Sequence, residues 1–278
     1  MARYGMVLNL DRCIGCYNCQ VACKDEHVGN DFSPVSKSQP TYGHFWIGIR
    51  EVERVLSPSH IRVTYIPTPC QQCGDAPCMR AARNGAVYRR SDGIVIIDPA
   101  KAVGQKQLVE SCPYGVIFWN EKENLAQKCT FCAHLLDDGW SQPRCVQTCP
   151  AGCMTFGDLD DPKSSASKLL KELKAETLQP EFKAKPNVHY AGLPKPQLSG
   201  RVAFADKDEW AAAIRVTLSD GGGRKRVAKT DAFGDFAFDG LELKTYSVRF
   251  DAPGYQSQIQ EVRMKQDAQY LGEVMLRA

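Results

Sequence analysis

Short runs of apolar and β-branched residues, separated by polar and glycine-rich turns, fill the chain from about Leu198 onward. Turn signals include Asp220-Gly-Gly-Gly and Ala252-Pro-Gly. Strands are expected at Gly200–Ala205, Ala213–Leu218, Arg226–Thr230, Asp235–Phe238, Tyr246–Phe250, Ile259–Met264 and Tyr270–Met275. Short strands at this spacing predict a small all-β sandwich over residues 198–278.

The first part of the chain has a different texture, with short strands and helices between loops rich in Cys, Pro and Gly. Gly43–Arg54, Ile61–Tyr65 and Gly93–Ile97 read as strands. Ser164–Lys174 has a helical pattern with a serine at its start, and prolines follow at positions 180, 186, 194 and 196. We therefore expect an α+β region over residues 1–162, then a helix and Pro-rich linker arm over 163–197.

Composition narrows the class of protein. The chain has 278 residues, is 43% hydrophobic and carries a formal net charge of +3, so nothing suggests nucleic-acid binding. No run of about 18 apolar residues predicts a membrane span. The N-terminus lacks the long apolar segment of a secretory signal, so we expect a cytoplasmic protein. Export bound to a partner that carries its own signal stays open.

The cysteines are more informative than the overall composition. All 13 lie between Cys13 and Cys153. A disulfide scaffold is typically small and secreted, with an even number of cysteines. This chain is large, and its cysteines are odd in number and clustered, so metal binding is favoured.

The first cysteine motif has the spacing of bacterial ferredoxins. It reads Cys13-Ile-Gly-Cys16-Tyr-Asn-Cys19-Gln-Val-Ala-Cys23, a C-x2-C-x2-C-x3-C run. In this pattern three thiolates hold one iron–sulfur cube, and the fourth cysteine ligates a different cluster.

Three further motifs follow, two of them incomplete. The cysteines are Cys70, Cys73 and Cys78 in the second motif, Cys112 in the third, and Cys129, Cys132, Cys145 and Cys149 in the fourth. By ferredoxin spacing, the second and third motifs lack cysteines at Ala82, Ala102, Gln105 and Leu108.

Cross-ligation between paired motifs divides twelve cysteines into three complete sets of four. Cluster one takes Cys13, Cys16, Cys19 and Cys149; cluster two takes Cys23, Cys129, Cys132 and Cys145; cluster three takes Cys70, Cys73, Cys78 and Cys112. The four missing ligands all belong to one further site. We therefore predict three [4Fe–4S] clusters, with one site lost as a whole.

The remaining candidates have ordinary interpretations that we favour. Cys153 is left over and reads as a buried free thiol. His27 and His134 follow cluster motifs and could tune a cluster by hydrogen bonding, but ordinary loop or surface histidines are more common. Lys24 and Lys128 adjoin ligands and could offset cluster charge; for these two residues a solvated lysine is equally plausible. A structural zinc protein is an alternative of another class, although the Cys13 run is a poor zinc motif.

The four motifs in this order resemble the iron–sulfur subunits of the molybdopterin (dimethyl-sulfoxide-reductase-type) oxidoreductases over about residues 4–162. The resemblance includes Lys128-Cys-Thr-Phe-Cys, and Cys149-Pro followed by Phe156-Gly-Asp-Leu-Asp-Asp-Pro. The lost site, the β domain, Cys112-Pro-Tyr-Gly-Val and Cys132-Ala-His-Leu-Leu-Asp-Asp look closest to the small subunits of pyrogallol–phloroglucinol transhydroxylase and resorcinol hydroxylase.

This resemblance implies a partner, a large catalytic subunit that carries a molybdenum or tungsten bis-pterin and acts on hydroxylated aromatic compounds. It also implies that cluster one lies nearest the pterin and that the missing site is the distal one. The sequence contains no Ser–His–Asp pattern, GxGxxG or P-loop, so no catalytic residue is expected in this chain. Electron transfer is the expected function. A free-standing polyferredoxin, or a subunit of another molybdopterin reductase, is the alternative.

Overall fold

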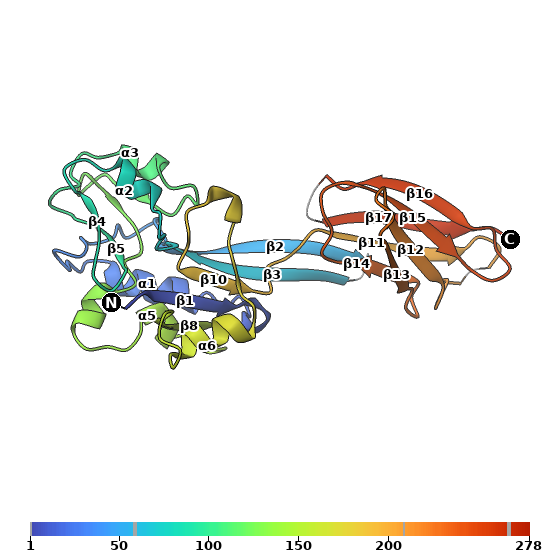
Figure 1. Cartoon of the computed structure of the whole chain (residues 1–278), viewed down its shortest axis with the longest axis horizontal. Coiled ribbons are helices and arrows are strands. Elements are labelled where there is room, and N and C mark those ends of the chain that lie inside the picture. The colour runs from blue at the N-terminus through green and yellow to red at the C-terminus, as the bar shows by residue number, and fades with distance from the viewer. Residues whose placement is uncertain (1, 58–59, 208, 266–267) are drawn as a thin grey trace. The chain divides into compact units, whose positions relative to one another are not determined.

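The computed structural model describes residues 2–57, 60–207, 209–265 and 268–278. The chain forms two compact units (Figure 1). The first comprises Met1–Glu51 and Tyr65–Leu193, and the second comprises Val52–Thr64 and Pro194–Ala278. Among the described residues, no helix is long and apolar enough to cross a membrane.

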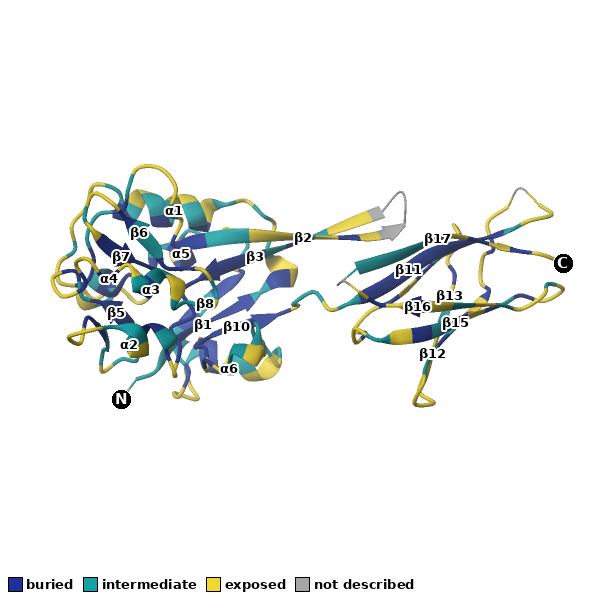
Figure 2. Ribbon diagram, turned by 90° about the horizontal axis from the view of Figure 1, so that it is seen from above, coloured by how far each residue is buried: buried dark blue, intermediate teal, exposed yellow. Residues whose placement is uncertain are grey.

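The first unit is built on a four-stranded sheet in which β1 (Tyr4–Asn9) is an inner strand. β1 pairs antiparallel with β8 (Met154–Asp158) on one side and parallel with β10 (Val188–Ala191) on the other. β10 pairs in turn with β9 (Glu176–Thr177). The middle of β1 is fully buried, as its dark colour in Figure 2 shows. The start of the first unit is therefore held by segments from its end.

The rest of the first unit consists of short helices and hairpins between the cysteine loops. The hairpins pair β4 (Val87–Arg89) with β5 (Val95–Ile97), and β6 (Phe118–Asn120) with β7 (Leu125–Gln127). A longer hairpin, β2 (Ile47–Ser57) with β3 (His60–Pro69), is shared between the units. The α-helices are α1 (Asn18–His27), α2 (Pro77–Ala81), α3 (Gln107–Glu110), α4 (Ala133–Asp137), α5 (Arg144–Gln147) and α6 (Ser165–Glu172), and the 3-10 helices are η1 (Leu10–Arg12) and η2 (Pro180–Phe182).

The division between the units differs from the boundaries that the sequence suggests. Residues 163–193, which lie within the segment 163–197 expected as a helix and linker arm, contribute α6, β9, η2 and β10 to the first unit. The physical reason is the parallel pairing of β10 with β1, in which Met6 faces Val188 and Asn9 faces Ala191. Residues 52–64 of the β2–β3 hairpin belong to the second unit, although they lie within the expected cluster region.

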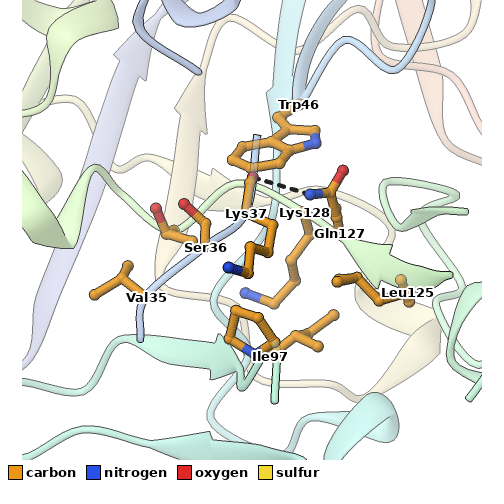
Figure 3. Close-up of a pocket in the computed structure, with 11 residues that line it drawn as sticks. Val35, Ser36, Lys37, Trp46, Ile97, Leu125, Gln127 and Lys128 are labelled. Atoms are coloured by element: carbon orange, nitrogen blue, oxygen red, sulfur yellow. Dashed lines mark hydrogen bonds between the residues drawn. The ribbon is translucent and has the colours of Figure 1, made fainter. Parts of the chain in front are cut away.

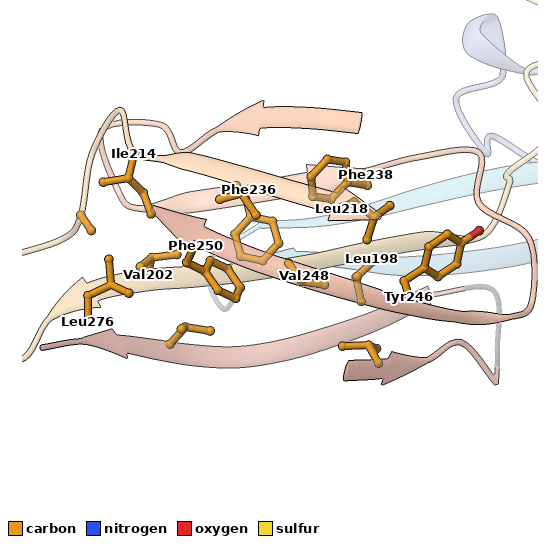
Figure 4. Close-up of a cluster of buried hydrophobic side chains, with 14 of the residues drawn as sticks. Leu198, Val202, Ile214, Leu218, Phe236, Phe238, Tyr246, Val248, Phe250 and Leu276 are labelled. Carbon is orange, nitrogen blue, oxygen red and sulfur yellow. The ribbon is translucent and has the colours of Figure 1, made fainter. Parts of the chain in front are cut away.

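The second unit is a sandwich of two sheets with strand orders β14-β11-β17 and β13-β12-β15-β16. Its strands are β11 (Gln197–Phe204), β12 (Arg215–Asp220), β13 (Lys225–Lys229), β14 (Asp235–Phe238), β15 (Thr245–Asp251), β16 (Gln258–Arg263) and β17 (Ala268–Leu276). Each of these strands overlaps one of the expected segments. Inward-facing residues such as Leu198, Val248 and Phe250 are fully buried in one core (Figure 4). The expected fold class, an α+β unit followed by an all-β sandwich, is confirmed.

Candidate cluster-binding site

The cysteines predicted for cluster one line a single pocket. Cys13, Cys16 and Cys19 come from the loop before α1 and from its first turn, whereas Cys149 follows α5. Cys16 is exposed, so this cavity lies near the surface of the first unit. The structure thus gathers four thiols that lie far apart in the sequence.

Cluster three's predicted cysteines line a second cavity. Cys70 and Cys73 follow β3, Cys78 lies in α2, and Cys112 follows α3. Tyr114 also lines this cavity, where burial raises the pKa of its hydroxyl.

The cysteines predicted for cluster two come together deep inside the first unit. Burial, followed by repulsion from the thiols of Cys129 and Cys132, holds the pKa of Cys23 well above its usual range. Burial and the same two neighbours, followed by Cys23, raise the pKa of Cys145 in the same way. All four cysteines are buried.

Cluster two's group lies between the other two. Cys19 and Cys23 are four residues apart on α1, so they lie on the same face of the helix. Burial, followed by repulsion from the nearby Cys70 thiol, raises the pKa of Cys129, so this group adjoins that of cluster three. The order of the three groups in space is therefore one, two, three.

Several residues in the cysteine loops adopt left-handed backbone conformations. Gly15 has φ +64°, and a Cβ there would lie 2.6 Å from the Tyr65 ring, so this position requires glycine. Tyr17 and Cys132 also have positive φ values, of 61° and 50°. Each of these two residues directly precedes a helix, α1 or α4.

The donor set fits [4Fe–4S] clusters. Backbone N–H groups donate to the ligand sulfurs, from Phe131 to Cys129 Sγ at 3.4 Å and from Cys153 to Cys149 Sγ at 3.3 Å. Burial raises the pKa of Cys19 to about 12 and of Cys78 to about 11, so the thiolates of such a group need cations for compensation. The irons of a cluster bound by four thiolates supply that charge.

Within the described residues, no three His, Cys, Asp or Glu side chains converge as they do around one metal ion. The thiols line cavities instead. The grouping matches the cross-ligation pattern, while the assignment of individual ligands and the number of clusters stay predictions.

Other side chains fill the positions where the sequence predicts that the ligands of a fourth site are missing. Ala102 and Leu108 are fully buried in a core that also includes Ala82. Gln105 places its side-chain amide between two loops: Oε1 accepts from Arg83 N at 2.9 Å, and Nε2 donates to Lys101 O at 2.8 Å. The sequence indicated that ligands are missing at these positions. Nothing in it indicated that the side-chain amide of Gln105 would link two loops.

Cys153, the thirteenth cysteine, is buried, as expected, and lines the cavity of cluster one. A hydrogen bond from its thiol lowers the pKa of Cys13 to about 6. Its backbone N–H supports Cys149, as described above. Cys153 therefore contacts two predicted ligands of cluster one without belonging to any set of four.

Two other residues near the cysteines are buried: Lys128, for which the sequence left two interpretations open, and His27, for which it favoured an ordinary one. Lys128 is 2% exposed, and its Nζ donates to the carbonyls of Val95 and Cys129. It lines a small pocket with Trp46 and Ile97 (Figure 3). His27, expected as an ordinary loop or surface histidine, is 1% exposed and faces Cys132. The loops that bury His27 cannot be identified from any local sequence motif.

Comparison with known proteins places this geometry in a family. The 4Fe-4S dicluster domain matches residues 61–159, and the carboxypeptidase regulatory-like domain matches residues 197–276. The pyrogallol hydroxytransferase small subunit of Pelobacter acidigallici is 42% identical over 261 residues, which cover 91% of this chain and 92% of the relative. The chain belongs to the iron–sulfur subunits of the dimethyl-sulfoxide-reductase-type oxidoreductases.

Other relatives in this family match a smaller share of the chain. A putative dimethyl sulfoxide reductase iron-sulfur subunit from Halobacterium salinarum is 34% identical, with 68% of this chain and 79% of the relative covered. A tetrathionate reductase subunit from Salmonella typhimurium is 35% identical, with 69% and 73% covered. As an iron–sulfur subunit of this family, the chain is an electron-transfer component of a molybdopterin oxidoreductase and implies a catalytic partner.

Proposed function

We propose that the chain carries three [4Fe–4S] clusters and relays electrons to or from a large molybdenum or tungsten bis-pterin subunit. The observation that supports this proposal is that the cysteines predicted for each cluster lie near one another, while Gln105 and apolar side chains stand where further ligands would be expected. Each group offers the thiolates that one cluster requires.

The partner is proposed to act on hydroxylated aromatic compounds such as pyrogallol, phloroglucinol or resorcinol. The support is the likeness to the pyrogallol hydroxytransferase small subunit, which extends over 91% of the chain and therefore includes the second unit. The likeness to the reductase relatives covers 68% and 69% of the chain.

We place the docking of the catalytic partner next to cluster one. Cys16 is exposed there, and two apolar side chains near it are open to solvent, Ile14 at 66% and Val21 at 63%. Exposed apolar side chains next to a redox centre suit a partner surface that excludes water. Electrons would then pass in order through clusters one, two and three.

Anaerobic purification of the native complex tests the proposal. About twelve irons and twelve sulfides per chain, together with a large pterin subunit that converts a hydroxylated aromatic compound, are expected. The same iron content without a partner would favour a free polyferredoxin. Zinc without sulfide would overturn the cluster assignment.

Fractionation of the source cells tests where the complex is located. We propose that the complex is cytoplasmic, so the chain should fractionate with soluble cytoplasmic proteins. Recovery outside the cytoplasm would indicate export together with the partner.

A further inference from the structure

His27, at the C-terminal end of α1, directs a ring nitrogen at a predicted cluster ligand. Its Nε2 lies 3.9 Å from Cys132 Sγ, within the range of hydrogen bonds to sulfur. We propose that His27 donates an N–H···S hydrogen bond to Cys132 and thereby sets the reduction potential of cluster two. This inference rests on the proposed assignment of Cys132 as a cluster ligand.

The ring is held in place on several sides. Trp46 lies 4.5 Å from it between ring centroids, and Phe32 and His134 pack edge-on at 5.6 and 5.2 Å. His27 is 1% exposed. A side chain enclosed in this way does not turn to find another partner, so the orientation toward Cys132 belongs to the fold.

The chemistry of this contact determines which ring nitrogen of His27 carries the proton. The sulfur of an iron-bound thiolate has no hydrogen to give, so it accepts only. The Nδ1 of His27 has no hydrogen-bond partner among the described residues. A buried N–H without a partner costs more than a buried lone pair, so the proton belongs on Nε2, where the sulfur accepts it.

A network of polar contacts around His134 lies next to the His27 ring. His134 Nε2 lies 3.1 Å from Glu26 Oε1, and Arg144 lies 3.7 Å from the other oxygen of the same carboxylate. The His134 ring also stacks on Phe32, with centroids 3.7 Å apart. Within the described part of the chain, His27 makes no hydrogen bond to this network, so its contact with Cys132 can be changed separately.

The effect on the cluster has a definite sign. Reduction adds one electron, and part of the added negative charge falls on the ligand sulfurs. A donor N–H stabilises this more negative state, so it raises the midpoint potential of the cluster it contacts. Only cluster two should respond, because His27 contacts Cys132.

An EPR-monitored redox titration of the anaerobically purified complex tests this role. The signal of cluster two is the one that Cys145→Ser removes. In His27→Phe, which keeps a ring but loses the donor, this signal should titrate at a more negative potential. We expect about a tenfold change in the reduction equilibrium, or ~59 mV for one electron. His27→Gln, whose Nε2 can donate from a similar position, should bring the midpoint potential most of the way back to the wild-type value.

His189→Phe is the matched control, since His189 lies in β10 and its Nε2 has no partner among the described residues. It should leave all midpoints unchanged. An unchanged cluster-two midpoint in His27→Phe, or an equal shift in every cluster, would overturn the proposal. If Cys145→Ser removes no signal, the ligand assignment itself fails.

A measurement on the unsubstituted chain avoids any folding defect of the variants. With ¹⁵N-labelled histidine, pulsed EPR should detect a histidine nitrogen and an exchangeable proton coupled to the cluster-two signal. Absence of both couplings would contradict the hydrogen bond.

Discussion

Gln105 Oε1 accepts a hydrogen bond from the backbone N–H of Arg83 at 2.9 Å. The same amide donates to Arg83 O at 3.2 Å, so the two residues are joined in both directions. Gln105 stands at a position where a ferredoxin-type site would have a cysteine ligand. Arg83 directly follows another such position, Ala82. A hydrogen-bonded side chain thus links the loops that a cluster would otherwise bridge.

Gln105→Ala should therefore destabilise the first unit. The substitution leaves the partly buried Arg83 N–H without its acceptor, at a cost of about 1–3 kcal/mol. At ~2–4 °C per kcal/mol, the apparent Tm should fall by several degrees in a thermal melt. Gln256→Ala, an exposed position in the second unit, is the control and should change little. A wild-type Tm in Gln105→Ala would show that the amide contributes nothing.

Cys112→Ser should remove cluster three alone. Cys112 lines one cavity with Cys70, Cys73 and Cys78, and none of the other predicted ligands lines that cavity. Iron should fall by about four atoms per chain, and the EPR signals of the other clusters should persist. Loss of every cluster signal from a chain with intact secondary structure by circular dichroism would contradict the pairing of the second and third motifs.

Cys153→Ala should leave the iron content unchanged. Its backbone N–H, which supports Cys149 Sγ at 3.3 Å, is retained in the variant. Cys149→Ala, four residues earlier, is the matched comparison and should cost the iron of cluster one. Equal iron loss in the two variants would make Cys153 a ligand.

Phe250→Ala should weaken the second unit without loss of iron. The side chain is fully buried and packs edge-on against Phe236, with centroids 5.5 Å apart. Truncation of such a residue costs about 3–5 kcal/mol. Limited proteolysis should then cleave within residues 194–278 earlier than in the wild type. Phe233→Ala, at a residue 64% exposed, is the control. Iron loss in Phe250→Ala would show that the cluster unit depends on the β sandwich.

Local patterns were sufficient to predict the β strands of the second unit and to propose the cysteine groups. Ferredoxin spacing reflects the geometry of a cube bound within one loop, so Cys13, Cys16 and Cys19 identify one another from the sequence. The strands from β11 to β17 are likewise separated by clear turn residues.

Distant pairings were not predictable in this way. The parallel contact between β1 and β10 joins Met6 with Val188, and nothing in either segment identifies the other. The burial of His27 arises similarly from Phe32 and Trp46, which lie in a loop without periodicity.

The position of β1 has a consequence for biogenesis. Its partners, β8 and β10, are synthesised much later, and the fourth predicted ligand of cluster one, Cys149, also emerges late. During translation the N-terminal thiols therefore leave the ribosome with neither their sheet nor their full ligand set. With Cys149 as its predicted fourth ligand, cluster one is completed only after most of the first unit has been translated, and the N-terminal thiols have to stay reduced until then.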